Sequence, residues 1–322
     1  MFRLAAFLGL AGLAAATAVI VWSGWAQVSD ALAQAGWGIA AVALFHFTHL
    51  AVSSTGWRVL MPGKRRPSWA MFCYFMWVRA AVNNLMPVAR IGGEIAAVRL
   101  MIAHGMRKNV AIAITVVELT LSIAAIFVFV ALGVLAFALR VSDHGIVTQL
   151  AWGLALSSPL IGVLAVVQKI GFFGLLARLF RALFRDKWTA FAGNAARLDR
   201  AVAAIYRRHR RAVLCGVLQF VAWSLGAVEV WLSLTFLGHP LSLLESAMIE
   251  ALIQGSASAA FAIPGALGVQ EASFLLFGGM LGLSPATAAA LAVMRRCRDL
   301  LCYAPGLVAW QAHEGKRLLR SL

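Results

Sequence analysis

Hydrophobic positions run along the chain in long, nearly uninterrupted stretches, not in the short periodic patterns of soluble helices or strands. A helix needs roughly 20 apolar residues to cross about 30 Å of hydrocarbon. Six stretches meet that length: residues 4–25, 36–57, 109–139, 146–168, 212–237 and 286–311. The pattern predicts an all-α polytopic membrane protein with about six full transmembrane helices.

Two further apolar regions, residues 69–103 and 243–283, are each interrupted near the middle. The first interruption runs from Asn83 to Pro87 and the second from Ile263 to Gly268, and each contains a proline. Proline and glycine are the residues that most often end a helix. Each region is therefore predicted to be a re-entrant hairpin of two short helices with a break between them.

Composition agrees with a membrane protein, because 62% of the residues are hydrophobic and 12% are charged. Of the 28 Lys and Arg residues, 21 fall in segments that the spans assign to one side, and only Arg140 falls on the other. Cytoplasmic loops are enriched in these residues. We expect one integral domain over residues 1–322 in a bacterial-type inner membrane, with both termini in the cytoplasm.

The first stretch, residues 4–25, also resembles a signal peptide, with Arg3 before an alanine-rich apolar run. The run is longer than the usual signal core and has no clear cleavage site. A retained anchor is the expectation and cleavage the alternative.

A shift of 177 residues along the chain carries Pro87 onto Pro264 and Glu94 onto Glu271. The same shift relates two halves, residues 36–139 and 212–311, each with a span, a broken hairpin and a span. Cationic residues follow the first hairpin, whereas an uncharged segment follows the second. The halves are thus predicted to be inverted repeats, an arrangement that commonly places a binding site where broken helices meet.

Twelve charged residues remain at the predicted membrane depth. The cations are Arg79, Arg90, Arg99, Arg295, Arg296 and Arg298, and the acids are Glu94, Glu118, Glu229, Glu250, Glu271 and Asp299. A lone charge at the centre of a bilayer costs about 2.5–3.5 kcal/mol, so pairing is the minimum expectation. Their alternative role is to tie the halves together without forming a site.

Spacing suggests particular partners. Arg90 and Glu94 are four residues apart, as are Arg295 and Asp299, which brings each pair together on a helix. The 177-residue shift also puts Glu118 opposite Arg295, and we expect a pair between them across the halves.

Other candidate chemistry is sparse. His46 and His49 lie on one helical face and could be two metal ligands, but interior histidines are the favoured interpretation because no third ligand is near. The four cysteines form no C-x-x-C pair and are expected to be packing residues. Nucleotide-loop and hydrolase motifs are absent from the sequence, so no cofactor is expected and an enzyme has no positive support.

Residues 169–211 form a basic linker with a helical amphipathic pattern. Such a segment is typical of a helix on an anionic lipid surface, which is favoured here over nucleic acid. A plain connection between the halves remains the alternative.

The two hairpin motifs resemble the membrane region of the lysylphosphatidylglycerol synthase and flippase-like family. The residues that carry the resemblance are Asn83-Asn84-Leu85-Met86-Pro87-Val88-Ala89-Arg90-Ile91-Gly92-Gly93-Glu94, Arg99-Leu100 and Ile263-Pro264-Gly265-Ala266-Leu267-Gly268-Val269-Gln270-Glu271. It covers roughly residues 5–312. The first motif and the segment from Leu237 to Pro240 are most similar to the branch associated with hopanoid biosynthesis, HpnL.

The resemblance implies a polytopic inner-membrane protein that handles or moves lipids. In relatives with aminoacyl-lipid synthase activity a cytosolic transfer domain follows this region, and since the sequence stops at Leu322 a complete synthase is not expected.

The function predicted from these observations is a lipid transporter or flippase, for hopanoids or phospholipids, in which both hairpins surround a head group. The expected substrate-binding residues are Asn83, Asn84, Pro87, Arg90, Glu94, Arg99, Glu118, Pro264, Glu271, Arg295, Arg298 and Asp299. Two alternatives stay open: an intramembrane lipid-modifying transferase, and a scaffold that holds lipid-biosynthetic enzymes through the basic linker.

Overall fold

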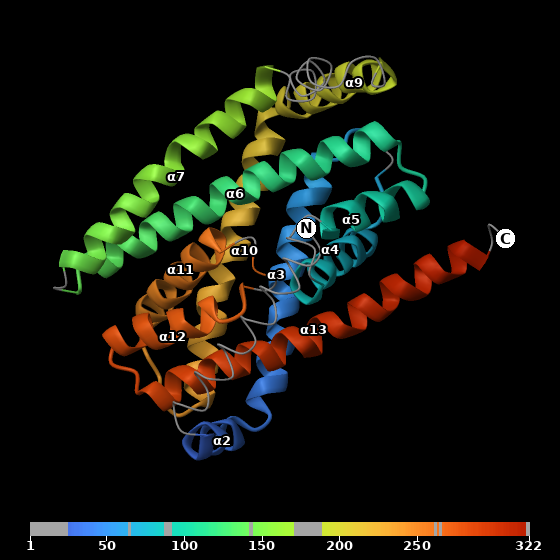
Figure 1. The fold of residues 1–322 in the computed structure, drawn as a ribbon. Helices are drawn as coiled ribbons and strands as arrows, with labels where there is room; N and C mark the ends of the chain where they lie inside the picture. Colours follow the sequence, from blue (N-terminus) through green and yellow to red (C-terminus); the bar gives the residue numbers. More distant parts are fainter. Residues whose placement is uncertain are drawn as a thin grey trace.

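A computed structural model describes residues 25–63, 66–86, 92–141, 144–170, 189–260, 263 and 266–319. Within these ranges the chain folds into α-helices joined by turns (Figure 1). The helices are α2 (Trp25–Ala35), α3 (Gly38–Leu60), α4 (Trp69–Leu85), α5 (Gly92–Ala103), α6 (Lys108–Ala138), α7 (His144–Ile170), α9 (Thr189–Tyr206), α10 (His209–Phe236), α11 (Leu243–Ala259), α12 (Val269–Met280) and α13 (Pro285–Leu319).

Three helices of the described chain, α3, α6 and α10, are long and apolar enough to cross a membrane. They cover three of the six predicted spans. Helices α7 and α13 cover two more as helices, while the stretch 4–25 lies outside the described residues apart from its last residue. The all-helical fold is confirmed, and the number of crossings stays a prediction.

Both interrupted regions contain two helices of matched length. Helices α4 and α11 have 17 residues each, and α5 and α12 have 12 each. Ser68 and Ser242 cap α4 and α11, each side-chain oxygen accepting from a backbone N–H of the first turn, which satisfies a group that the helix leaves free. Pro87 and Pro264 lie outside the described residues.

The far ends of the two hairpins also match. Gly105 follows α5 with φ 84°, and Gly282 follows α12 with φ 92°. Glycine reaches this left-handed conformation without a steric penalty, and so it ends helices efficiently. Because the starts of α4 and α11 differ by 174 residues and those of α5 and α12 by 177, the second break is three residues longer than the first.

Helix contacts keep the same pattern when the two sets of four helices are exchanged. Helix α3 packs against α10, α4 against α13, and α6 against α11. Each hairpin's first arm therefore lies on the last helix of the other half, and α6 and α13 run in opposite directions in Figure 1. This pattern is what a two-fold relation between the halves would produce, although their inversion stays a prediction.

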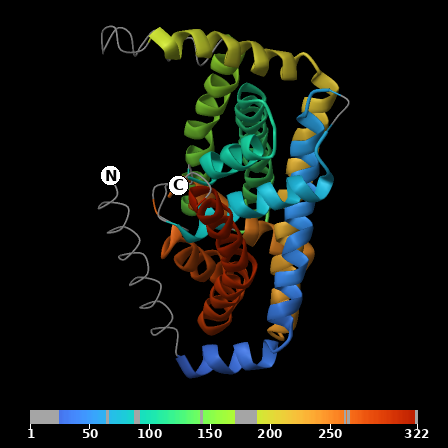
Figure 2. The same cartoon turned by 90° about the vertical axis from the view of Figure 1, so that its right-hand side faces the viewer.

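Two helices lie across the ends of the long pair α3 and α10. Helix α2 lies at one end of this pair and α9 at the opposite end (Figure 2). The described part of the basic linker is α9, whose Val202 and Ile205 are buried in the core formed with α3, α4 and α6. The expected amphipathic stretch at residues 171–188 lies outside the described residues.

Close packing between α6 and α11 yields a stability prediction. A Cβ on Gly133 would lie 2.2 Å from the Cβ of Ala251, so Gly133→Ala should lower the free energy of unfolding by about 1–3 kcal/mol through overpacking. Gly216→Ala in α10 is the matched control, because its Cβ would meet nothing within 4 Å. Thermal unfolding in detergent measures both, and equal midpoints for the two variants would contradict the α6–α11 contact.

Candidate functional site

The first polar network joins the first hairpin to α6 through one arginine. Arg79 on α4 donates from Nε to Oε1 of Glu94 on α5 at 2.8 Å, and from Nη1 to Oε2 of Glu118 on α6. Its guanidinium also lies 5.3 Å from the centre of the Trp57 ring. A single cation thus pairs with carboxylates from two other helices.

Amide side chains complete this network. Asn83 fixes the start of α5 because its Oδ1 accepts from the backbone N–H of Gly93 at 2.8 Å, and its Nδ2 approaches Glu94 at 3.4 Å. Gln219 on α10 donates to Oε1 of Glu118 at 2.9 Å and accepts from the Ser53 hydroxyl of α3 at 2.8 Å. The network therefore reaches from the hairpin to the central pair α3 and α10.

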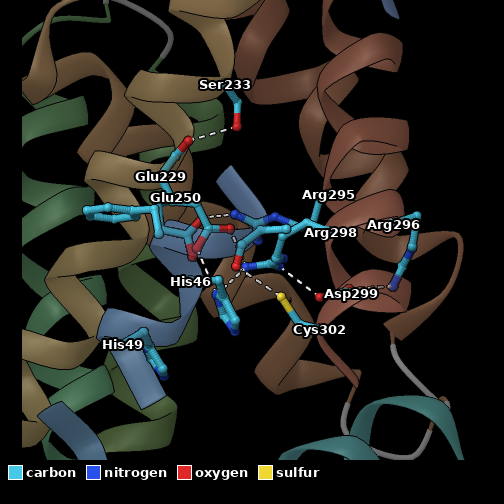
Figure 3. A network of polar contacts seen from close by, with 12 residues as sticks. His46, His49, Glu229, Ser233, Glu250, Arg295, Arg296, Arg298, Asp299 and Cys302 are labelled. Carbon is cyan, nitrogen blue, oxygen red and sulfur yellow. Dashed lines mark hydrogen bonds and ion pairs between the residues drawn. The ribbon is translucent and has the colours of Figure 1, made fainter. Parts of the chain in front are cut away.

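The second network surrounds four charged residues on one stretch of α13 (Figure 3). Arg295 pairs with Glu250 of α11, and its guanidinium lies 5.0 Å from the centre of the Phe274 ring. Gln254 donates to the other Glu250 oxygen at 2.7 Å. These contacts bind the last helix to the second hairpin's first arm.

Arg296 and Arg298 extend the second network in two directions. Arg296 donates from Nε to Oε1 of Glu271 on α12 at 2.7 Å, and its Nη1 lies 3.7 Å from Oδ2 of Asp299. Arg298 pairs with Oδ1 of Asp299 at 2.9 Å and with Glu229 of α10. Asp299 therefore links a hairpin pair to a pair at the centre of the molecule.

The charged groups of both networks are largely shielded. The exposed fraction is 1% for Glu118, 2% for Glu271, 8% for Arg79 and 7% for Arg298. Charges at this depth are stable only when paired, because an isolated one loses its hydration. The structure thus has both networks in a closed, ion-paired arrangement.

Two acceptor oxygens near the breaks have no hydrogen-bond partner among the described residues. They are Oε2 of Glu94 in the first turn of α5 and Oε1 of Gln270 in the first turn of α12. The 177-residue shift carries Glu94 to Glu271, the neighbour of Gln270. A buried acceptor without a donor costs about 1–3 kcal/mol, so both positions favour a ligand that brings N–H or O–H groups.

Most of the residues predicted as a site are brought into these networks. Asn83, Glu94 and Glu118 meet in the first network, and Glu271, Arg295, Arg298 and Asp299 meet in the second. Asn84 donates to the Ala80 carbonyl of its own helix, and Arg99 is exposed. Pro87, Arg90 and Pro264 lie outside the described residues, and so does the expected Arg90–Glu94 pair.

Two expected pairings are wrong. Glu118 does not meet Arg295 across the halves, since Arg79 binds Glu118 and Glu250 binds Arg295. Asp299 binds Arg298 and Arg296 and not the residue four positions before it. Each last helix instead forms its ion pair with the first arm of its own half, although it packs more closely against the first arm of the other half.

Several network members were absent from the predicted site. Glu229, Glu250 and Arg296 are among the charges at membrane depth, whereas His46 and Tyr303 were not connected to them. The signal that could have identified His46 and Tyr303 is a polar side chain inside an apolar span. His46 and His49 are interior residues, as favoured; His49 donates from Nδ1 to the Ala222 carbonyl of α10 at 2.7 Å.

A separate apolar cavity of about 140 Å³ lies between α3, α6 and α9. It is lined by Leu60, Pro62, Val110, Ala113, Ala201, Ala204, Ile205 and Arg208. It is therefore distinct from both ion-pair networks and adjoins the basic end of the molecule.

Comparison with known proteins gives one match. Residues 9–306 match the family described as the lysylphosphatidylglycerol synthase TM region. No curated protein and no solved structure matches the chain.

The first network predicts a large penalty for losing its arginine. Arg79→Met leaves Glu94 and Glu118 without their cation, and the free energy of unfolding should fall by about 3–5 kcal/mol. Arg140→Met is the control, because Arg140 makes an exposed pair with Glu245 that contributes about 0–1 kcal/mol. Chemical unfolding in detergent measures both variants.

A rescue variant separates charge from lost packing. Adding Glu94→Gln and Glu118→Gln to Arg79→Met removes the unpaired negative charges and should restore part of the stability. A triple variant no more stable than the single one would show that packing, not charge, causes the loss.

Proposed function

The chain belongs to the family of lysylphosphatidylglycerol synthase transmembrane regions, and we propose that it moves a membrane lipid between the two leaflets. Family membership and the apolar helices make it a membrane protein of a family related to lipid biosynthesis. The proposal adds that the lipid head group passes between the two broken hairpins while the acyl or polycyclic tail stays in the hydrocarbon.

The observation that carries this proposal is the pair of acceptor oxygens on Glu94 and Gln270 without donors. Both lie at the start of a hairpin's second arm, where non-helical backbone at membrane depth is tolerated if it lines a cavity. A head group that offers hydroxyl or ammonium groups would satisfy both oxygens. Polyol, phosphoglycerol and aminoacyl head groups share this chemistry.

Two arginines each lie beside two acids, and this supports a site whose hairpin arms can move. Arg79 binds both Glu94 and Glu118, and Arg296 binds Glu271 and lies near Asp299. Each arginine could release its hairpin carboxylate and keep a second acid as its partner. Movement of the second arm of either hairpin, α5 or α12, therefore leaves Arg79 and Arg296 each beside a counter-charge.

Two observations bear on the identity of the lipid, and they favour different classes. The motif similarity to the hopanoid-associated branch favours a polycyclic lipid, and the arginines favour a phosphate. In the first case the arginines serve pairing alone; in the second Arg298 and Arg295 would contact the phosphate. A lipid panel distinguishes the two.

Orientation belongs to the same proposal. The end of the molecule that carries α9 also carries Arg58, Arg66, Arg208 and Arg211. Slight burial, and then the charges of Arg211, Arg58 and Arg208, lower the pKa of Arg66 from its ordinary value. We assign this basic end to the cytoplasmic, anionic leaflet of a bacterial inner membrane, with both termini on that side.

The hairpin carboxylates supply the functional prediction. Glu94→Gln and Glu271→Gln each remove a charge while Arg79 and Arg296 keep Glu118 and Asp299 beside them, so both variants should fold. A charged hydrogen bond contributes about 1.5–3 kcal/mol, which corresponds to roughly a 10- to 150-fold loss of translocation rate. Purified protein in liposomes with fluorescent anionic, zwitterionic and polycyclic neutral lipids measures the rate, and Glu245→Gln is the control.

The outcomes distinguish the alternatives. Lipid movement that needs both acids supports a flippase and identifies its lipid class. Folded protein that moves no lipid would contradict the flippase proposal. In that case a chemically altered lipid would indicate a transferase. Loss of enzyme recruitment after neutralisation of the basic residues of α9 would indicate a scaffold.

Orientation has its own test with two matched substitutions. In a variant without its four native cysteines, His209→Cys lies at the basic end and His239→Cys at the opposite end, and both positions are exposed. A membrane-impermeant thiol reagent added to spheroplasts should label position 239 at once and position 209 only after permeabilisation. The reverse pattern would contradict the assigned orientation.

A further inference from the structure

His46 lies where α3, α10 and α13 meet, and it is buried (Figure 3). Its Nδ1 lies 2.8 Å from Oε2 of Glu229 and 2.7 Å from Nη1 of Arg298. Its Nε2 lies 2.7 Å from the hydroxyl of Tyr303. Polar groups of two other helices therefore converge on one imidazole ring.

Nδ1 cannot satisfy both of its neighbours in any one protonation state. A guanidinium N–H only donates, and an ionised carboxylate only accepts. With a proton, Nδ1 donates to Glu229 and faces an N–H of Arg298; without one, it accepts from Arg298 and turns its lone pair toward Glu229. The proton therefore selects which helix His46 binds.

The other side of the ring tolerates either state. The Tyr303 hydroxyl both donates and accepts, so it can serve Nε2 as a bare nitrogen or as an N–H. Nε2 therefore keeps its contact with Tyr303 in either protonation state, and only the contact at Nδ1 changes.

The remaining charged and titratable neighbours keep their own partners. His49 stacks on His46 with ring centres 5.4 Å apart and is bound to the Ala222 carbonyl. Asp299 holds Nη2 of Arg298 at 2.9 Å, and the Arg295–Glu250 pair lies on the adjoining helices. Arg298 would thus remain neutralised after leaving His46.

We propose that His46 is a proton-binding site whose occupancy exchanges a contact between α3 and α13 for one between α3 and α10. Only the N–H bond forms or breaks: the proton comes from water, and it returns to water when the ring deprotonates. The protonated ring would repel Arg298, which keeps Asp299 and the second oxygen of Glu229 as partners. Helix α13 also carries the residues that bind both arms of the second hairpin, so a change of the Arg298 contact reaches that hairpin while Tyr303 of α13 keeps its contact with the ring.

If the protein moves lipid as proposed, this exchange also identifies the ion that drives the movement. That part of the inference rests on the proposed function. Proton binding would remove the His46–Arg298 contact between α3 and α13, and proton release would restore it. The chemical class of the coupling ion is therefore a proton rather than a metal cation.

The proton site is tested directly by nuclear magnetic resonance of the histidine ring nitrogens. Phe45–His46 is the one Phe-His pair in the sequence, so labelling Phe carbonyl carbon and His nitrogen identifies His46 without a mutation. Spectra are recorded from about pH 8 to about pH 5, and the proposal requires the Nδ1 resonance to change from that of a bare nitrogen to that of a protonated one. A resonance that stays constant over this range would overturn the proposal, whether or not any lipid moves.

Coupling is tested with matched histidine variants in liposomes. Wild-type translocation should change at least several-fold between the two ends of that pH range and respond to an imposed pH gradient. His46→Gln should fold and lose both responses, whereas His49→Gln should keep both. Retention of the pH response in His46→Gln would overturn the coupling. If that variant does not fold, Tyr303→Phe is the second test, because it removes only the hydroxyl beside Nε2. It should shift the His46 ring resonances and the pH profile of translocation together.

Absence of lipid movement in every protein, including wild type, would contradict the proposed function. The ring-nitrogen titration would still decide whether His46 takes up a proton. The two failures are thereby distinguished.

Discussion

Neutralisation of charge at membrane depth is the constraint on which the arrangement of the helices depends. A bare carboxylate or guanidinium there is costly, so each has to find a partner on another helix or on its own. Helix α13 shows the consequence most directly: Arg295, Arg296 and Arg298 bind carboxylates on α11, α12 and α10. The position of the last helix is thus set by three ion pairs as well as by apolar packing.

The same constraint explains why the helices could be predicted and the partners could not. Helix breaks are local, since proline, glycine and capping serines act on their own turn, and the hairpins follow the predicted regions closely. Partner choice depends on which faces meet in space. Glu118 and Arg295 have opposite charges at equivalent positions, yet Glu118 pairs with Arg79 and Arg295 pairs with Glu250. Neutral members such as Gln219 and Tyr303 could not be found in this way, because the sequence analysis selected charged residues.

The two ion pairs come from related positions in the hairpins. Counted from the starts of α4 and α11, Arg79 is the eleventh residue and Glu250 the eighth, and this difference of three residues is close to one helical turn. The two side chains therefore lie on similar faces of their helices, and each pairs with the last helix of its own half. The halves therefore carry the same kind of ion pair with its charges exchanged, a relation that sequence identity alone would not show.

Charge balance connects the hairpins with His46. Among the described residues of the two networks, the carboxylates of Glu94, Glu118, Glu229, Glu250, Glu271 and Asp299 face the guanidiniums of Arg79, Arg295, Arg296 and Arg298. The members of the networks that the structure describes thus include more carboxylates than guanidiniums. A proton on His46 and a head group with an ammonium group would both reduce that excess, and Asp299 joins the two regions through Arg296 and Arg298. In the proposed mechanism, binding of one would weaken the demand for the other, as the exchange of a proton against a cationic head group requires.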